Sequence, residues 1–197
     1  MSDLEPREHM TTAALLSSNH CVGLGRRALR QLRESLERDT GLQAATYLQE
    51  AGFAGGEELY STYAAWLDRT AGIAEPGALD ADRLGEMLSR FFSETGWGSL
   101  SVDRMGDAVL ALDSSDWAEA ADASGAAYPS CHLSCGLLAD FLGRMSGDTV
   151  AVMEVECRSR GDDRCRFLGG SPDTMATLYD RMAQGMGYGQ ALGIEGR

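Results

Sequence analysis

Cysteine is the residue type best able to do chemistry in this sequence, and four of its five cysteines lie after residue 130. Thiolates and a carboxylate are ligands that suit zinc in tetrahedral geometry. The chain offers one such set in its C-terminal part: Cys131, Glu154, Cys157 and Cys165. The spacing alone leaves three interpretations open, namely a metal site, buried thiols that only fill the core, and thiols with redox chemistry.

A predicted hairpin brings two of these cysteines together. Strands over residues 149–157 and 165–168, joined by a turn at 159–163, place the Cys157 and Cys165 thiols at the turn end of the hairpin. Glu154 and Cys157 are three residues apart, so they point to opposite faces of a straight strand. Both can face one site only if the strand has a bulge, or ends, near Val155.

A predicted helix over residues 131–145 supplies the third thiol. Cys131 lies at its N-terminus, where the helix dipole favours a thiolate. Cys135 follows one helical turn later. We therefore expect the start of this helix to face the turn of the hairpin.

The remaining elements predict an α+β fold. Period-two segments around Gly106 indicate a first hairpin, with Leu100, Val102, Val109 and Ala111 on one face, and a long loop covers 113–130. Asp80 and Ser171-Pro172 are expected to begin helices. The predicted helices cover residues 22–38, 42–52, 57–70, 81–95, 131–145 and 173–184. We expect an antiparallel sheet built from hairpins and flanked by helices.

The composition limits the classes of partner. Among 197 residues there are 30 acidic and 17 basic side chains, a net charge of −13, which disfavours nucleic acid and anionic membranes. Neither an apolar span of membrane length nor a signal peptide is apparent. We therefore expect a cytoplasmic protein with reduced thiols rather than disulfides.

One domain is expected over residues 19–187, preceded by a mobile arm at 1–18 and followed by a tail at 188–197. Four arginines lie on the first helix of that domain. Glu34 and Glu37 balance them, so we interpret them as a solvated face: Arg26, Arg27, Arg30 and Arg33.

The segment 128–167 resembles the 4-vinyl reductase-like domain. The shared features are Cys131 with Gly136 five residues later, Glu154-x-x-Cys157, Gly161-Asp162 and Cys165-Arg166-Phe167, and Gly96-Trp97-Gly98 is similar as well. This small-molecule-binding domain also forms the sensory part of aromatic-responsive bacterial activators. In those sensors three cysteines and a glutamate hold zinc, which favours the metal interpretation of Cys131, Glu154, Cys157 and Cys165.

The resemblance also implies a fold shared with small subunits of vesicle-tethering complexes, a homodimer and a hydrophobic cavity. Cys135 and Val152 fall at pocket-lining positions of the aromatic sensors, and Leu110 replaces a tryptophan that anchors a polar group there. The residues expected to line the cavity are Phe92, Trp97, Leu100, Leu110, Cys135, Leu138 and Val152. Each of them is equally compatible with plain core packing.

Three functions follow as hypotheses. The first is a module that binds a small apolar or aromatic molecule, with a closed structural zinc site. The second, an accessory or carrier in the vinyl reduction of a tetrapyrrole, comes from the name of the resembled family. The third is an interaction subunit with a filled cavity. No nucleophile–base set or cofactor motif indicates catalysis.

Overall fold

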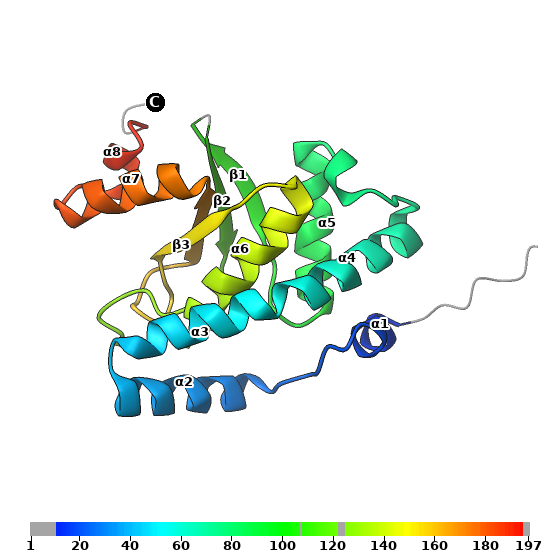
Figure 1. Cartoon of the computed structure of the whole chain (residues 1–197), viewed down its shortest axis with the longest axis horizontal. Helices are drawn as coiled ribbons and strands as arrows, with labels where there is room; N and C mark the ends of the chain where they lie inside the picture. The colour runs from blue at the N-terminus through cyan, green and yellow to red at the C-terminus, as the bar shows by residue number, and fades with distance from the viewer. Residues whose placement is uncertain (1–10, 107, 122–124, 195–197) are drawn as a thin grey trace, which may run out of the picture.

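The computed structural model describes residues 11–106, 108–121 and 125–194 (Figure 1). Its helices are α1 (Thr12–Ser18), α2 (Arg26–Thr40), α3 (Gln43–Ala54), α4 (Gly56–Ala71), α5 (Ala81–Glu94), α6 (His132–Ser146), α7 (Pro172–Ala183) and α8 (Tyr188–Ala191), with a 3-10 turn at Pro76–Ala78. Its strands are β1 (Ser101–Met105), β2 (Val109–Ser114), β3 (Ala151–Glu156) and β4 (Cys165–Gly170).

The two predicted hairpins form one antiparallel sheet. β1 pairs with β2 and β3 pairs with β4, and the hairpins join through β2 and β4 to give the order β1-β2-β4-β3. The predicted α+β class, with an antiparallel sheet flanked by helices, is therefore confirmed.

Local capping explains where two helices begin. The Asp80 Oδ1 atom accepts a hydrogen bond from the Arg83 backbone N at 2.9 Å, at the start of α5. The Ser171 hydroxyl accepts one from the Thr174 backbone N at 3.2 Å, with Pro172 in the first turn of α7. Both helix starts are as predicted from the sequence.

Helices cover both faces of the sheet. On one face Leu112 and Phe167 pack into the larger core with residues of α4, α5 and α6. On the other face Val109 and Ala111 pack with residues of α7 and α8. Figure 1 shows α7 lying beside the sheet, apart from α6.

The expectation that Val109 and Ala111 share a face with Val102 is wrong. The register pairs Val102 with Leu112 and Asp103 with Ala111, so Val102 and Ala111 lie on opposite faces. Because β2 is buried on both faces, its apolar residues do not alternate with polar ones, and the period of two is lost from its sequence.

Two glycines let α6 approach α3 closely. A Cβ atom at Gly52 would lie 1.9 Å from the Leu133 carbonyl oxygen, and one at Gly136 would lie 1.9 Å from the Gln49 carbonyl oxygen. Only glycine fits such a backbone contact. This crossing fixes α6, and with it the helix start that carries Cys131.

The N-terminal segment is more ordered than an arm. Residues 1–10 lie outside the described residues, but residues 12–18 form α1, with Leu15 only 2% exposed. The Thr12 hydroxyl donates to Glu94 at 2.8 Å. The expected arm is therefore wrong for residues 12–18, because one turn with a single buried leucine is too short to show a period.

Candidate functional site

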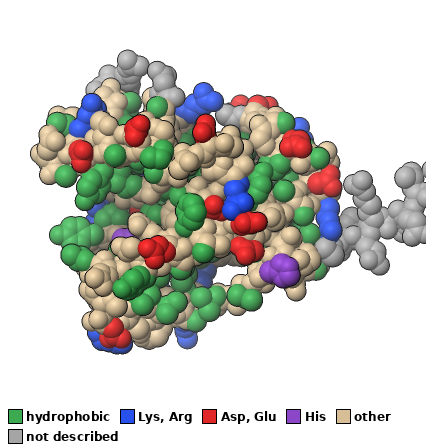
Figure 2. Space-filling model, viewed as in Figure 1, with side chains coloured by type: hydrophobic (Ala, Val, Ile, Leu, Met, Phe, Trp, Pro, Cys, Tyr) green, Lys and Arg blue, Asp and Glu red, His purple; other side chains and the backbone are tan. Residues whose placement is uncertain are grey.

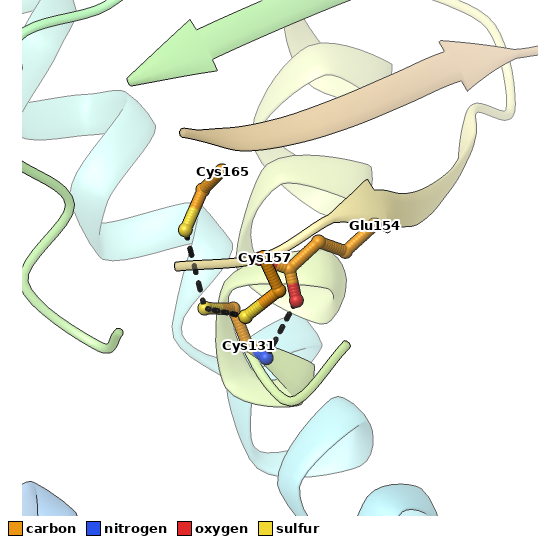
Figure 3. Close-up of side chains that lie close together, drawn as sticks. All are labelled: Cys131, Glu154, Cys157 and Cys165. Carbon is orange, nitrogen blue, oxygen red and sulfur yellow. Dashed lines mark hydrogen bonds between the residues drawn. The ribbon is translucent and has the colours of Figure 1, made fainter. Parts of the chain in front are cut away.

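The four predicted metal ligands come together in one buried cluster (Figure 3). The Cys131 sulfur lies 3.9 Å from the sulfurs of Cys157 and Cys165. All four ligand atoms lie within 4.8 Å of one another. The cysteines are fully buried and Glu154 is 8% exposed, so the cluster is shielded from water.

A β-bulge brings Glu154 and Cys157 to one site. Glu154 pairs with Phe167 and Glu156 pairs with Arg166, so the register shifts at Val155. The extra residue makes a spacing of three behave as a spacing of two, which places both side chains on the α6 side of the sheet. The bulge predicted from the sequence is confirmed.

The turn after β3 holds Cys157 in place. The Asp162 carboxylate accepts a hydrogen bond from the Cys157 backbone N at 2.7 Å and one from the Arg160 guanidinium at 2.9 Å. Gly161 has a φ of 109°, which side chains rarely tolerate. The Gly161-Asp162 pair therefore shapes the loop that returns the chain to Cys165.

The polar network of the second hairpin continues on the opposite face. After the bulge, Glu156 points to that face, where Arg164 donates to it at 2.7 Å. Arg166 donates to both oxygens of Asp113, at 2.7 and 2.6 Å. The Tyr188 hydroxyl of α8 also bonds Glu156. These contacts brace the strands that carry Cys157 and Cys165.

The donor set and its spacing fit a tetrahedral metal ion. Zinc–sulfur bonds of about 2.3 Å place two tetrahedral sulfurs about 3.8 Å apart, close to the observed 3.9 Å. Glu154 Oε2 accepts a hydrogen bond from the Cys131 backbone N at 2.8 Å. Glu154 Oε1 is buried without a hydrogen-bond partner among the described residues, which leaves it open as a ligand. The cluster could hold a metal ion.

Electrostatics in the cluster also call for a cation. Burial, and then the charge of Cys157, raises the pKa of Glu154 to about 8. Hydrogen bonds from Cys131 and Cys165 lower the pKa of Cys157, whereas the bond to Cys157 raises the pKa of Cys131. The expectation of a favoured Cys131 thiolate is wrong, because neighbouring thiols outweigh the helix dipole. Binding of a cation at this site would release protons.

Glu119, which the sequence did not single out, caps α6 next to the cluster. Its carboxylate accepts hydrogen bonds from the backbone N atoms of Leu133 at 3.1 Å and Ser134 at 2.7 Å. The Ser134 hydroxyl also donates to Glu119, and it accepts from Trp117 at 2.7 Å. Burial raises the pKa of Glu119 to about 7. Only its place in a long loop distinguished it from 29 other acidic residues.

Arg33 ties α2 to the same region. It is 4% exposed, and its Nη1 atom donates to the Glu119 carbonyl at 3.3 Å and to the Ser130 hydroxyl at 3.2 Å. Ser130 in turn lies 3.8 Å from the Cys157 sulfur. The predicted solvated face is therefore wrong for Arg33, although Arg27 and Arg30 are exposed.

A cavity of about 600 Å³ lies on the other side of α6. One wall is the chain between α1 and α2, and the others are α3, α4 and the start of α6. Its apolar lining includes Leu59, Trp97, Leu133 and Leu137. Figure 2 shows hydrophobic side chains gathered along this lower part of the molecule.

The structure separates Trp97 from the other residues expected to line a cavity. Trp97 lines the 600 Å³ cavity, whereas six expected residues belong to the larger core or pack against it: Phe92, Leu100, Leu110, Cys135, Leu138 and Val152. Trp97 contacts that core through Trp117, with ring centroids 5.5 Å apart. The sequence missed the walls formed by α3 and by the α1–α2 connection, because neither shows a ligand-specific pattern.

The comparisons with known proteins agree with the site. Residues 114–171 match the model of the vinyl-4-reductase domain family, and this segment contains all four residues of the cluster. The predicted resemblance to the 4-vinyl reductase-like domain is thereby confirmed. An uncharacterized protein of Methanocaldococcus jannaschii is 35% identical over 80 residues, which is 41% of this chain and 42% of that protein. The match thus spans less than half of that relative.

Two solved structures are similar. The phenol-responsive sensory domain of the transcription activator PoxR, solved with phenol, is 21% identical with a TM-score of 0.55, over 80% of this chain and 82% of that one. It shares the fold. A vinyl-4-reductase family protein of Methanocaldococcus jannaschii is 18% identical with a TM-score of 0.45, over 86% and 97%. Among the described helices, none is long and apolar enough to cross a membrane.

Proposed function

We propose that this chain is a cytoplasmic, sensor-like domain that binds a small apolar or aromatic molecule and is stabilised by structural zinc. The observation that carries the proposal is the largely apolar 600 Å³ cavity, whose size is typical of small-molecule sites. The match to the vinyl-4-reductase domain family and the fold shared with the PoxR sensory domain support it.

The zinc ion would be held by Cys131, Glu154, Cys157 and Cys165. Four protein ligands leave no position for a substrate water, so the ion would stabilise the fold rather than catalyse a reaction. It would join the hairpin to the start of α6, two parts of the chain that the hydrogen bond from the Cys131 backbone N to Glu154 also links.

The ligand would lie against Trp97, and the core residues predicted for the pocket would form the wall behind it. These are Phe92, Leu100, Leu110, Cys135, Leu138 and Val152. The rings of Trp97, Trp117 and Phe92 connect the two regions, with successive centroids 5.5 and 5.6 Å apart.

We further propose a homodimer and a single domain over residues 19–187. Exposed apolar side chains on α2, α3 and the adjoining segments support a self-association surface: Val22, Leu24, Leu32, Leu42 and Phe53.

Native mass spectrometry compared with the denatured mass tests these proposals together. We expect one zinc ion per chain, an organic adduct of low mass and a dimer. Cys157→Ser should lose the zinc ion, whereas Cys21→Ser, outside the cluster, should keep it. A bare mass after zinc supplementation would overturn the zinc site, and failure of every apolar probe to bind would overturn the sensor function.

A further inference from the structure

The cavity contains a carboxylate oxygen that the protein leaves unpaired. Glu58 lines the cavity from the first turn of α4. Its Oε2 atom is buried and has no hydrogen-bond partner within the described part of the chain. A buried polar atom without a partner costs free energy, so this position favours a ligand that supplies a donor.

Three other polar side chains of the lining already have protein partners. Arg26 donates to the Gly96 carbonyl at 3.0 Å, and Thr95 donates to the Phe91 carbonyl at 2.9 Å. The Cys21 thiol lies 3.7 Å from the Thr62 hydroxyl. Glu58 Oε2 is therefore the group in this lining that is open to pairing with a ligand.

We propose that the cavity takes an apolar molecule that carries an amine, whose ammonium group donates to Glu58. The apolar part would lie against Leu59, Trp97 and Leu137. A charged donor pairs with a carboxylate more strongly than a neutral one, and the net charge of −13 attracts cations generally. This inference rests on the proposed function and specifies the chemical class of its ligand.

Three probes that share a phenyl ring and differ in the polar end test the inference. They are 2-phenylethylamine, 2-phenylethanol and 3-phenylpropanoate, titrated against the full chain by tryptophan fluorescence and calorimetry. We expect the amine to bind about tenfold more tightly than the alcohol and the carboxylate to bind most weakly.

The matched variants are Glu58→Gln and Glu57→Gln. Both remove one negative charge from the first turn of α4, but Glu57 is 67% exposed and pairs with Arg144 at 3.0 Å outside the cavity. We expect Glu58→Gln to abolish the amine preference and Glu57→Gln to keep it. Glu58→Asp, which retains the charge on a shorter side chain, should keep a reduced preference and guards against a folding defect in the glutamine variant.

The outcomes separate this inference from the proposed function. Equal binding of the three probes, or an amine preference that survives Glu58→Gln, would overturn the ligand class and leave the sensor function in place. Absence of binding by all three probes to the unmodified chain would instead count against the cavity as a ligand site.

Discussion

The metal cluster and the cavity both adjoin the first turns of α6, yet they differ in order. The cluster consists of side chains between 0% and 8% exposed, held by the hairpin, the bulge and the cap of α6. One wall of the cavity is the chain between α1 and α2, where Val22 is 91% exposed and Leu24 is 60% exposed.

This difference indicates two roles for one helix. Dense burial and hydrogen bonding fix the geometry that a metal ion requires. A segment without helix or strand, with few buried contacts, opens at low free-energy cost and can adjust to a ligand. Because Leu133 and Leu137 face the cavity while Cys131 starts the helix, α6 connects the rigid region to the adaptable one.

The largest expected effect is loss of the metal ion. Cys157→Ser, or treatment with a chelator, should lower the free energy of unfolding by more than about 4 kcal/mol, because binding energy at a structural zinc site is folding energy. Thermal melting followed by circular dichroism measures it, with Cys21→Ser as the control. An unchanged melting temperature after verified metal removal would exclude a structural role for the ion.

The next effect concerns the glycine crossing that positions α6. Gly136→Ala should cost about 3 kcal/mol, since the new Cβ would lie 1.9 Å from the Gln49 carbonyl oxygen. Gly85→Ala in α5 is the control, because its Cβ would lie 3.5 Å from Val102 and alanine favours a helix. Urea denaturation should separate the two, and equal stabilities would show that the helices can move apart.

A similar effect is expected from pH at the cap of α6. The pKa of Glu119 is about 7 in the folded chain against an ordinary 4.5. The unfolded chain therefore releases this proton first, and the free energy of unfolding falls by about 3 kcal/mol as pH rises through this interval.

Glu119→Gln removes that titration. The stability of the variant relative to the unmodified chain should therefore increase between about pH 5 and pH 8. Taking the difference cancels the pH dependence that the metal ligands contribute to both proteins. Denaturation curves at the two pH values measure this difference, and parallel profiles would contradict the raised pKa.

The smallest effect on stability is expected at the cavity wall. Val22→Ser should change the free energy of unfolding by less than about 0.5 kcal/mol, yet weaken binding of 2-phenylethylamine a few-fold by removing apolar contact. Leu42→Ser, at a side chain 92% exposed away from the cavity, should change neither. A large loss of stability in Val22→Ser would show that this wall is as fixed as the metal cluster.

Chemistry and local spacing predicted the metal cluster well. Its four members and the bulge at Val155 follow from a few residues near one another in the sequence, and the Asp80 and Ser171 caps depend on adjacent residues only. Such features are readable because the residue type itself restricts the chemistry or the backbone.

Tertiary structure decided the features that depend on distant segments. Arg33 on α2 meets Ser130 across 97 positions, and the unpaired oxygen of Glu58 acquires meaning only where α4 borders a cavity. The opposite faces of Val102 and Ala111 likewise depend on helices added on both sides of the sheet. The sequence by itself determined which groups could hold a metal ion, because a thiol is chemically distinctive. Which acids and arginines are buried was decided by packing, because the same side chains are at home in water until other elements cover them.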